Sequence, residues 1–543
     1  MNQQVKKTSI ARSAAVMGVA TFFSRIAGLV REQTFAFLFG AGIWTDAFNV
    51  AFRIPNLLRD LFAEGAMSAA FIPTFNAVLE KDGPQKAFKL TNLTFCAILV
   101  VVGALTLLGI AASPLLVSTL APEFTSNPEK FEVTVTMTRI MFPFLLAISW
   151  AAISMGILNS LGEFFIPAIA PVFLNLSMIL AGWLICPFAK EFDMPAITGM
   201  AIGAMLGGLL QFAVQLPALF RYGYRFRWQL NFNDPGIQRI IKLIIPGTVG
   251  LAATQINIAI STILATSQGE GAVSWLGYAF RVMQLPLGLF GVAVAQATLP
   301  VISRQAAAGD RDGMAQTLAG SIRLSSFINL YACFALIALA EPVVRILFQH
   351  GRFNAADTVA TALALKAYAI GLLFYSLIKI LGPAFYTLDE TKTPVIASVT
   401  AVVVNIFLNL VLVHPFGYWG LALGTGIGAM FNAGILYYKL EKRIGSFSRF
   451  ALTGGLARIF VATASSGAVT AWAYQISAPL LAGISETLAP GSFFNAVIAS
   501  SVATLGGLLV LLLISRLLQI AEADKAIDML LRRLKRRKAQ PAD

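Results

Sequence analysis

Long runs of apolar residues recur along the whole chain, separated by short breaks that contain Pro, Gly and charged residues. Each run is long enough for an α-helix to cross the hydrocarbon core of a bilayer, which takes about 20 residues. The runs are continuous and do not alternate with polar residues, so they predict helices and not a membrane barrel. We predict about fourteen transmembrane segments: 11–38, 44–79, 88–120, 131–159, 164–187, 195–220, 237–266, 271–303, 314–348, 357–387, 393–413, 416–440, 451–479 and 493–520.

The composition agrees with a polytopic membrane protein. The 543 residues are 57% hydrophobic and 12% charged, whereas a soluble domain has about 25% charged residues. The net charge of +14 would suggest nucleic acid in a soluble protein, but here it lies in loops and no nucleic-acid partner is expected. Three scattered cysteines in apolar runs and only two histidines predict neither a disulfide nor a metal site.

The basic residues predict the orientation of the chain. One set of alternate loops and tails carries 28 Lys and Arg residues and the opposite set only 4. Cytoplasmic loops carry the excess of Lys and Arg, so both termini are expected in the cytoplasm. We therefore predict an even number of helices. The basic C-terminal tail, 523–543, is interpreted as a topology anchor that contacts anionic headgroups.

The sequence repeats itself at a spacing of 227–228 residues. Phe52-Arg53-Ile54 matches Phe280-Arg281-Val282, and the pattern from Leu161 to Val172 matches the pattern from Leu388 to Val399. Two copies of a six-helix unit are predicted in the same orientation, related by an axis along the membrane normal, as in transporters with a central site. The predicted domains are an N-lobe (1–222, helices 1–6), a C-lobe (223–443, helices 7–12), and two extra helices (444–522).

Eight basic residues lie inside predicted helices, where a charge exposed to lipid would cost several kcal/mol. They are Arg25, Arg31, Arg53, Arg59, Arg139, Arg281, Lys366 and Lys379. Fewer acids reach the same depth, namely Glu32, Asp46, Asp60 and Glu64, all on the first two helices. The interior is therefore predicted to be net cationic. Ion pairing or snorkelling toward an interface is the alternative role for each of these cations.

Helix geometry distinguishes paired charges from candidates for an external anion. Residues seven apart share a helix face, which places Arg25 with Glu32, and Arg53 with Asp46 and Asp60. Arg59 and Arg281 have no acid at neighbouring helical positions. Arginine binds phosphate well, so these two residues predict a phosphate or diphosphate ligand. The chain has no Gly-Lys-Ser/Thr motif, and ATP is not expected as the energy source.

Several motifs resemble the MurJ (MviN) family of lipid II flippases. They are Ser24-Arg25 with Gly28 and Arg31-Glu32; Phe39-Gly40-Ala41-Gly42 with Thr45-Asp46-Ala47-Phe48; Pro55-Asn56-Leu57-Leu58-Arg59; Phe62-Ala63-Glu64-Gly65-Ala66; Ser274-Trp275 with Arg281 and Pro286; Phe348 to Phe353; and Lys392-Thr393-Pro394. The resemblance covers the whole chain, including the two extra helices. It implies the fold of the multidrug/oligosaccharidyl-lipid/polysaccharide exporter superfamily, as in MATE transporters.

The resemblance also implies an activity and a site. The activity would be to flip undecaprenyl-diphosphate-linked peptidoglycan precursor, lipid II, from the cytoplasmic to the periplasmic leaflet by alternating access. The family's cavity arginines correspond to Arg25, Arg31, Arg59 and Arg281, and the extra helices to a groove for the lipid tail. The full predicted set is Arg25, Arg31, Arg59, Arg281, Ser24 and Asn56 for substrate, with Glu32, Asp46, Arg53 and Glu64 as supporting charges.

Other functions remain possible from the sequence. One alternative is a multidrug antiporter of the same fold, which would need acids in its cavity. A second is a flippase for another polyprenyl-diphosphate sugar, which only the motifs distinguish from a lipid II flippase. A non-transporting scaffold would not need intramembrane arginines, and no nucleophile–base arrangement indicates an enzyme. Asn405, Asn409 and Thr425, where some relatives bind sodium, include no carboxylate. A sodium site is therefore not expected, and we predict that the membrane potential drives transport. We also predict a monomer without cofactors.

Overall fold

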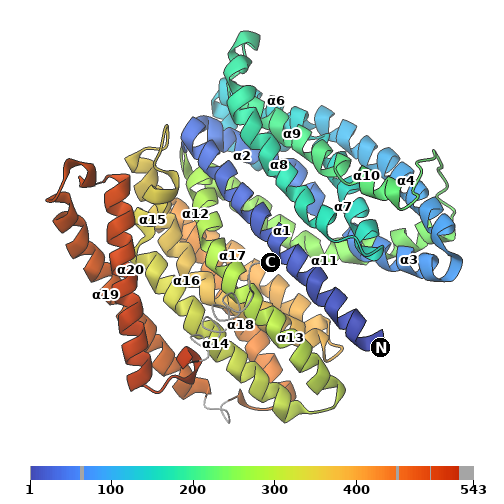
Figure 1. The fold of residues 1–543 in the computed structure, drawn as a ribbon. Helices are drawn as coiled ribbons and strands as arrows, with labels where there is room; N and C mark the ends of the chain where they lie inside the picture. Colours follow the sequence, from blue (N-terminus) through green and yellow to red (C-terminus); the bar gives the residue numbers. More distant parts are fainter. Residues whose placement is uncertain (1, 61–65, 448–451, 490, 525–543) are drawn as a thin grey trace, which may run out of the picture. The chain divides into compact units, whose positions relative to one another are not determined.

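The computed structural model describes residues 2–60, 66–447, 452–489 and 491–524, and these residues form helices and connecting turns, with no β-strand among them (Figure 1). Each of the fourteen predicted segments coincides with one helix or with two successive helices. The helices are α1 (Asn2–Phe39), α2 (Ile43–Arg59), α3 (Ala66–Asp82), α4 (Pro84–Ala111), α5 (Ser113–Leu120), α6 (Pro128–Met141), α7 (Phe144–Ser160), α8 (Phe165–Leu184), α9 (Thr198–Ala213), α10 (Leu216–Arg221), α11 (Pro235–Thr266), α12 (Ala272–Pro286), α13 (Val292–Ala307), α14 (Arg311–Ala338), α15 (Ala340–Phe348), α16 (Ala355–Tyr386), α17 (Lys392–Phe416), α18 (Tyr418–Ile444), α19 (Leu452–Ala482) and α20 (Phe493–Leu517).

Eleven helical stretches in the described part of the chain are long and apolar enough to cross a membrane. The three predicted segments outside this set are 11–38, 44–79 and 237–266. The first contains Arg25, Arg31 and Glu32, and the second is divided into α2 and α3 of 17 residues each. The third contributes a shorter apolar stretch, Ala252–Thr266. The chain is a multi-pass helical membrane protein, and the total of fourteen crossings stays a prediction.

The contacts divide the chain into two compact units. The N-terminal unit contains Met1–Ser274 and His350–Phe353, and the C-terminal unit contains Trp275–Gln349 and Asn354–Asp543. In the N-terminal unit α11 packs against α2, α3, α4 and α5. By its contacts α11 therefore belongs to the N-terminal unit, although it is the first helix of the second repeat copy.

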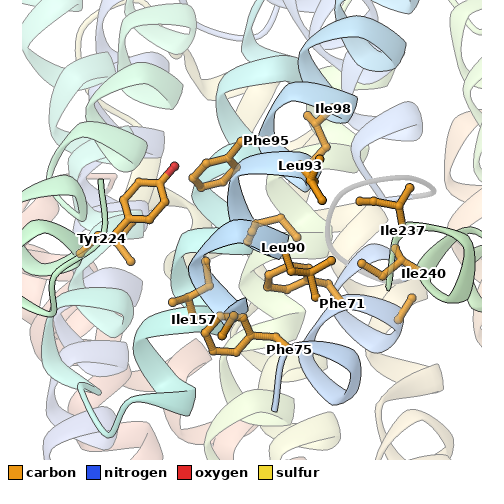
Figure 2. Close-up of a cluster of buried hydrophobic side chains, with 14 of the residues drawn as sticks. Phe71, Phe75, Leu90, Leu93, Phe95, Ile98, Ile157, Tyr224, Ile237 and Ile240 are labelled. Atoms are coloured by element: carbon orange, nitrogen blue, oxygen red, sulfur yellow. The ribbon is translucent and has the colours of Figure 1, made fainter. Parts of the chain in front are cut away.

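A core cluster of the N-terminal unit joins helices that are far apart in the sequence. Figure 2 shows Phe71 and Phe75 of α3 among side chains from α4, α7 and α11. Tyr224, which follows α10, is also buried in this cluster. Burial of apolar surface away from water contributes about 25 cal/mol per Å² to stability. The cluster thus holds the α10–α11 connection against α4.

Helix α2 has one apolar face and one polar face. Ala47, Phe48 and Ala51 are buried in a cluster with residues of α1, α6, α8 and α9. Arg53 lies on the other face and is exposed. The separation of the two faces follows from a helical period of about 3.6 residues, and it places Arg53 away from these core contacts, whereas Asp46 is buried.

The C-terminal unit has its own core, formed by α13, α14, α16, α17 and α18. The two helices outside the repeat attach to it through α14. Phe327 of α14 is buried with Ile459 of α19 and Leu511 of α20. Arg323 of α14 donates from Nε to Glu522 at 2.7 Å, with both side chains largely shielded from solvent. Helices α19 and α20 are therefore an integral part of the packing of this unit.

Landmarks in the backbone support the predicted repeat. Helices α1 and α11 end at positions 227 residues apart, and so do α4 and α14, which are both 28 residues long. The turns before α8 and α17 each contain a residue with positive φ, Gly162 and Asp389, again 227 apart. A π-helical residue at Asp60 corresponds to the π-helical turn Leu287–Gly291. The repeat thus extends from the sequence to the irregularities of its helices.

Two Gly-x3-Gly-x3-Gly stripes, Gly199/Gly203/Gly207 on α9 and Gly420/Gly424/Gly428 on α18, allow close helix contact. A Cβ atom added to Gly203 of α9 would lie 2.5 Å from the Cβ of Ala181 on α8. An added Cβ at Gly420 or Gly424 of α18 would collide with Leu412 or Asn409 of α17. These glycines permit two backbones to approach within a distance that any side chain would prevent.

Candidate functional site

The polar end of α1 carries the first candidate residues. Ser24 accepts a hydrogen bond through its backbone oxygen from Asn175 Nδ2 of α8 at 3.3 Å. Arg31 donates from Nε to Oε1 of the buried Glu32 at 3.1 Å, and its Nη2 contacts the same oxygen. Arg25 is exposed. The sequence placed Glu32 on the face of Arg25, whereas the structure shows it bound to the adjacent Arg31.

Helix α2 ends with an ion pair that the sequence analysis did not predict. Arg59 donates from Nε and Nη2 to Oδ1 of Asp60, at 3.2 and 2.9 Å. Gln255 of α11 donates to the other carboxylate oxygen at 3.4 Å. The prediction that Arg59 has no acidic partner is therefore wrong. Adjacent helical residues point about 100° apart, but the long guanidinium reaches across this angle to Asp60.

Among the described residues, α2 and α11 contain three buried amide oxygens without a hydrogen-bond partner. They belong to Asn56 of α2 and to Gln255 and Asn257 of α11. Asn56 uses its Nδ2 to donate to the backbone oxygen of Phe52 at 2.9 Å, so only its oxygen is unsatisfied. A buried acceptor without a partner costs about 1–3 kcal/mol. Such oxygens would gain stabilisation from a ligand that donates hydrogen bonds or from water.

Asp46 has a structural role that differs from the predicted one. Its carboxylate accepts hydrogen bonds from the backbone N–H of Gly271 at 2.7 Å and of Ser274 at 2.9 Å. The Ser274 hydroxyl donates to it at 2.6 Å and accepts from Asn49 at 3.2 Å. These donors lie at the N-terminus of α12, where unsatisfied N–H groups and the helix dipole favour an anion. The hydrogen bonds of Asp46 described here go to the start of α12 and not to Arg53, so Asp46 caps this helix.

We expect Asp46→Asn to destabilise the protein. The amide keeps one acceptor oxygen but loses the charge, and it places a donor against backbone donors, so the free energy of unfolding should fall by about 1–3 kcal/mol. Equilibrium unfolding in detergent measures this change. Asp82→Asn is the matched control, because Asp82 only forms an exposed pair with Lys86 at 2.8 Å. Equal effects of the two substitutions would contradict the capping role.

Arg281 lies in the C-terminal unit, on α12, and is exposed. Two contacts fix the beginning of that helix within the unit. Trp275 donates from its indole nitrogen to Asp357 of α16 at 3.0 Å, and its ring lies 5.1 Å from that of Tyr418. Pro286 and the π-helical turn Leu287–Gly291 follow Arg281 directly. Arg281 is thus held on a helix with a fixed start and an irregular end.

The remaining predicted residues are placed as follows. Arg53 is exposed on α2, and Glu64 lies outside the described residues. Asn409 donates to Asn405 at 3.2 Å, and the Thr425 hydroxyl donates to the backbone oxygen of Leu421 at 2.7 Å. Within the described residues no group of three or more His, Cys, Asp or Glu side chains could hold a metal ion.

The structure brings Arg59 together with Asp60 and Gln255, which are not among the predicted site residues. Asp60 is adjacent to Arg59 and does not share its helix face, so helical spacing does not predict their ion pair. Gln255 and Asn257 are amide residues within an apolar run, and this pattern marks them in the sequence as candidates for a polar site. A buried amide within a span needs a hydrogen-bond partner, so both positions could have been included.

Comparison with known proteins gives one consistent answer. A family model described as "Lipid II flippase MurJ" matches residues 35–489. A probable lipid II flippase MurJ from Vibrio cholerae is 38% identical over 437 residues, which cover 79% of this chain and 82% of the relative. A probable lipid II flippase MurJ from Rhizobium tropici is 34% identical over 539 residues, 98% of both chains.

Solved structures agree with this result. A structure of lipid II flippase MurJ in an inward closed conformation has a TM-score of 0.75 and 25% identity, and the match covers 92% of this chain and 99% of that one. An inward-facing MATE family multidrug transporter of the MOP superfamily has a TM-score of 0.62 at 16% identity, covering 80% and 99%, and shares the fold. The predicted MATE-like helical fold is confirmed. The chain belongs to the MurJ family of lipid II flippases.

Proposed function

We propose that this chain flips lipid II from the cytoplasmic to the periplasmic leaflet of the bacterial inner membrane. The observation that carries the proposal is the match of residues 35–489 to the MurJ family model. The bias of 28 to 4 basic residues between alternate loops supports a cytoplasmic location for both termini. The protein would act as a monomeric transporter by alternating access and not as an enzyme.

The diphosphate headgroup would bind to arginines of a central cavity. Arg31 and Arg59 are held by the adjacent acids Glu32 and Asp60 through the Nε–Nη2 edge of each guanidinium. Such a bond orients a guanidinium before the ligand arrives, which reduces the entropy that binding must overcome. A diphosphate carries more negative charge than one carboxylate, so it competes well for the same N–H groups. Arg25 and Arg281 are exposed and would complete the binding set.

The polar part of lipid II beyond the diphosphate contains hydroxyl and amide donors. The buried oxygens of Asn56, Gln255 and Asn257 are acceptors without partners. We assign them to the sugar and peptide groups, because a site that leaves acceptors unpaired in the empty state gains from a ligand that donates.

The undecaprenyl tail would lie along α19 and α20. These helices contact each other through small polar residues, with Ser466 donating to the backbone oxygen of Gly507 at 2.7 Å. On α20 the side chains of Leu505, Leu509 and Leu513 form a stripe at four-residue spacing, and each is 62% exposed. A continuous apolar stripe of this kind suits a long isoprenoid chain.

We expect the double substitution Leu505→Trp/Leu509→Trp to block transport without loss of the protein from the membrane. The larger rings would fill the stripe while the α19–α20 contact through Ser466 and Gly507 is kept. Complementation of a strain depleted of its flippase, with immunoblotting of membranes, measures both properties. Leu107→Trp is the control, because Leu107 is a 70% exposed residue of α4. Growth of the double variant at the wild-type rate would refute the proposed tail path.

The charge of the interior separates this proposal from a multidrug antiporter of the same fold. An antiporter for cationic drugs needs carboxylates that can bind the drug or a proton. The acids described on α1 and α2 are all engaged, since Glu32 binds Arg31, Asp60 binds Arg59 and Asp46 binds the start of α12. An anionic cargo is therefore favoured.

Depletion in the source bacterium tests the substrate. If the chain flips lipid II, its loss should trap lipid II in the cytoplasmic leaflet, as measured by protection from an externally added enzyme that cleaves the headgroup. Lipid-linked sugars of other pathways should remain accessible. The reverse pattern would indicate a flippase for another polyprenyl-diphosphate sugar.

A further inference from the structure

The connection between α10 and α11 contains a non-helical segment that is fixed along α4. We call residues 224–231 the strap. The hydroxyl of Tyr224 and the N–H of Arg227 both donate to Asn92 Oδ1, at 2.7 and 3.2 Å. Asn92 Nδ2 donates to the backbone oxygen of Arg225 at 3.0 Å. A single buried asparagine thereby forms hydrogen bonds with three residues of the strap, at positions 224, 225 and 227, and defines its path.

The strap exposes basic and aromatic side chains in alternation. Arg225, Phe226, Arg227 and Trp228 are all exposed, with exposed fractions of 56% for Phe226 and 60% for Trp228. Within the described residues neither of these two arginines forms an ion pair. Large aromatic rings next to Arg residues are typical of the membrane–water interface, where the rings enter the headgroup region and the cations face anionic lipids.

An apolar cavity of about 230 Å³ lies beside the strap, among α4, α7, α9 and α10. Its aromatic lining residues are Phe95, Trp150, Phe212, Phe220, Tyr224 and Phe226. Figure 2 shows the rings of Phe95 and Tyr224 close together, and their centroids are 5.9 Å apart. A smaller apolar cavity of about 150 Å³ holds a benzene molecule, so this one has room for several carbons of an acyl chain.

We propose that the strap and this cavity form a binding site for one anionic glycerophospholipid. The end of one acyl chain occupies the aromatic cavity, and Arg225 and Arg227 bind the phosphate of the headgroup. The occupant follows from the charges, because an apolar cavity bordered by two arginines without acidic partners complements a molecule with an anionic head and an apolar chain. The site lies outside the substrate-binding set and does not depend on the proposed transport function.

The headgroup half of the proposal predicts selective loss of anionic lipid. Purified protein in a neutral detergent would be titrated with phosphatidylglycerol or phosphatidylcholine, with bound lipids counted by native mass spectrometry. Arg225→Gln/Arg227→Gln should weaken phosphatidylglycerol binding by roughly 30-fold, since each basic residue near an anionic surface contributes about a factor of five. Phosphatidylcholine binding should not change. Arg304→Gln/Arg311→Gln, which removes two exposed arginines elsewhere, is the matched control. Equal losses in the two double variants would overturn the proposal.

The cavity half is tested by filling the space. Leu99 lines the cavity, whereas Val101 of the same helix is 57% exposed and does not line it. The mass spectrum of Leu99→Trp should lack the tightly bound phosphatidylglycerol, whereas that of Val101→Trp should retain it. Thermal unfolding would confirm that both variants are folded. Retention of phosphatidylglycerol by Leu99→Trp would refute the acyl-chain site. Displacement of phosphatidylglycerol by an equal concentration of undecaprenyl phosphate would assign the cavity to the substrate's tail and overturn it as well.

Discussion

Arg59→Ala and Arg281→Ala are each expected to abolish growth when they are the only copy of the flippase, while the protein still reaches the membrane. In the proposed site each substitution would remove charge-assisted hydrogen bonds to the diphosphate, and such bonds contribute about 1.5–3 kcal/mol apiece. The loss is larger in a cavity that excludes water, because the remaining groups cannot replace the missing charge. Lysine should rescue only partly, since a point charge lacks the planar fork of arginine. Complementation with immunoblotting of the membrane fraction measures both effects.

The ion pair between Arg59 and Asp60 requires a further variant. Arg59→Ala leaves Asp60 without its partner, so a folding defect could mimic a binding defect. Asp60→Asn keeps the guanidinium and removes the competing carboxylate, and it should preserve growth if Arg59 serves the ligand. Arg345→Ala is the matched control, because Arg345 forms a similar pair with Glu341 at 2.7 Å but lies outside the predicted site. If Asp60→Asn is as defective as Arg59→Ala, the ion pair itself is the essential element.

The helices of this protein were predictable from the sequence because a membrane-spanning helix requires a long apolar run. A helix in lipid satisfies its own backbone and needs about 20 apolar residues, and each predicted segment coincides with helical structure. The repeat was visible for the same reason, since corresponding residues keep their spacing. The resemblance in the α2 motif gave the family, which composition alone could not give.

The breaks within the segments were not predictable from hydropathy. Segment 88–120 is divided at Ala112, and segment 131–159 at Phe142 and Pro143. An apolar residue at a break is as hydrophobic as one within a helix, so a hydropathy pattern does not register the interruption. The membership of α11 in the N-terminal unit is a tertiary property and leaves no local signal either.

The intramembrane charges were predictable from the sequence as residue types, but their pairings were not. Intramembrane charges are costly, and this identified Arg31, Glu32, Asp46 and Arg59 from the sequence. Which acid binds which donor depends on side-chain length and on the positions of other helices. Asp46 binds the N-terminus of α12, 225 residues away in the sequence, and no periodicity within α2 contains that information.

Collapse of the membrane potential is expected to stop flipping, even with the pH gradient held constant and sodium absent. The diphosphate is anionic and the cytoplasm is electrically negative, so outward movement of each uncompensated negative charge is favoured by about 2.3 kcal/mol per 100 mV. In the proposed mechanism, arginines of a central cavity would offset the desolvation of the diphosphate during the crossing. After release, their own charge would be drawn toward the cytoplasm, which would return the protein to the inward-open state. The potential is therefore a sufficient energy source in this mechanism.

Proteoliposomes with a potassium gradient and valinomycin allow the potential to be set independently of pH and sodium. Flipping of lipid II should increase with the potential and fall to the protein-free rate at zero potential, with the Arg281→Ala variant as the inactive control. The region of Asn405, Asn409 and Thr425 supplies neutral oxygens without a carboxylate, and a hard cation such as sodium prefers charged oxygen ligands as well. A sodium gradient alone should therefore have no effect. Flipping that persists without a potential and follows the sodium gradient would contradict this mechanism, and the missing carboxylate would then have to be sought on α11 or its neighbours.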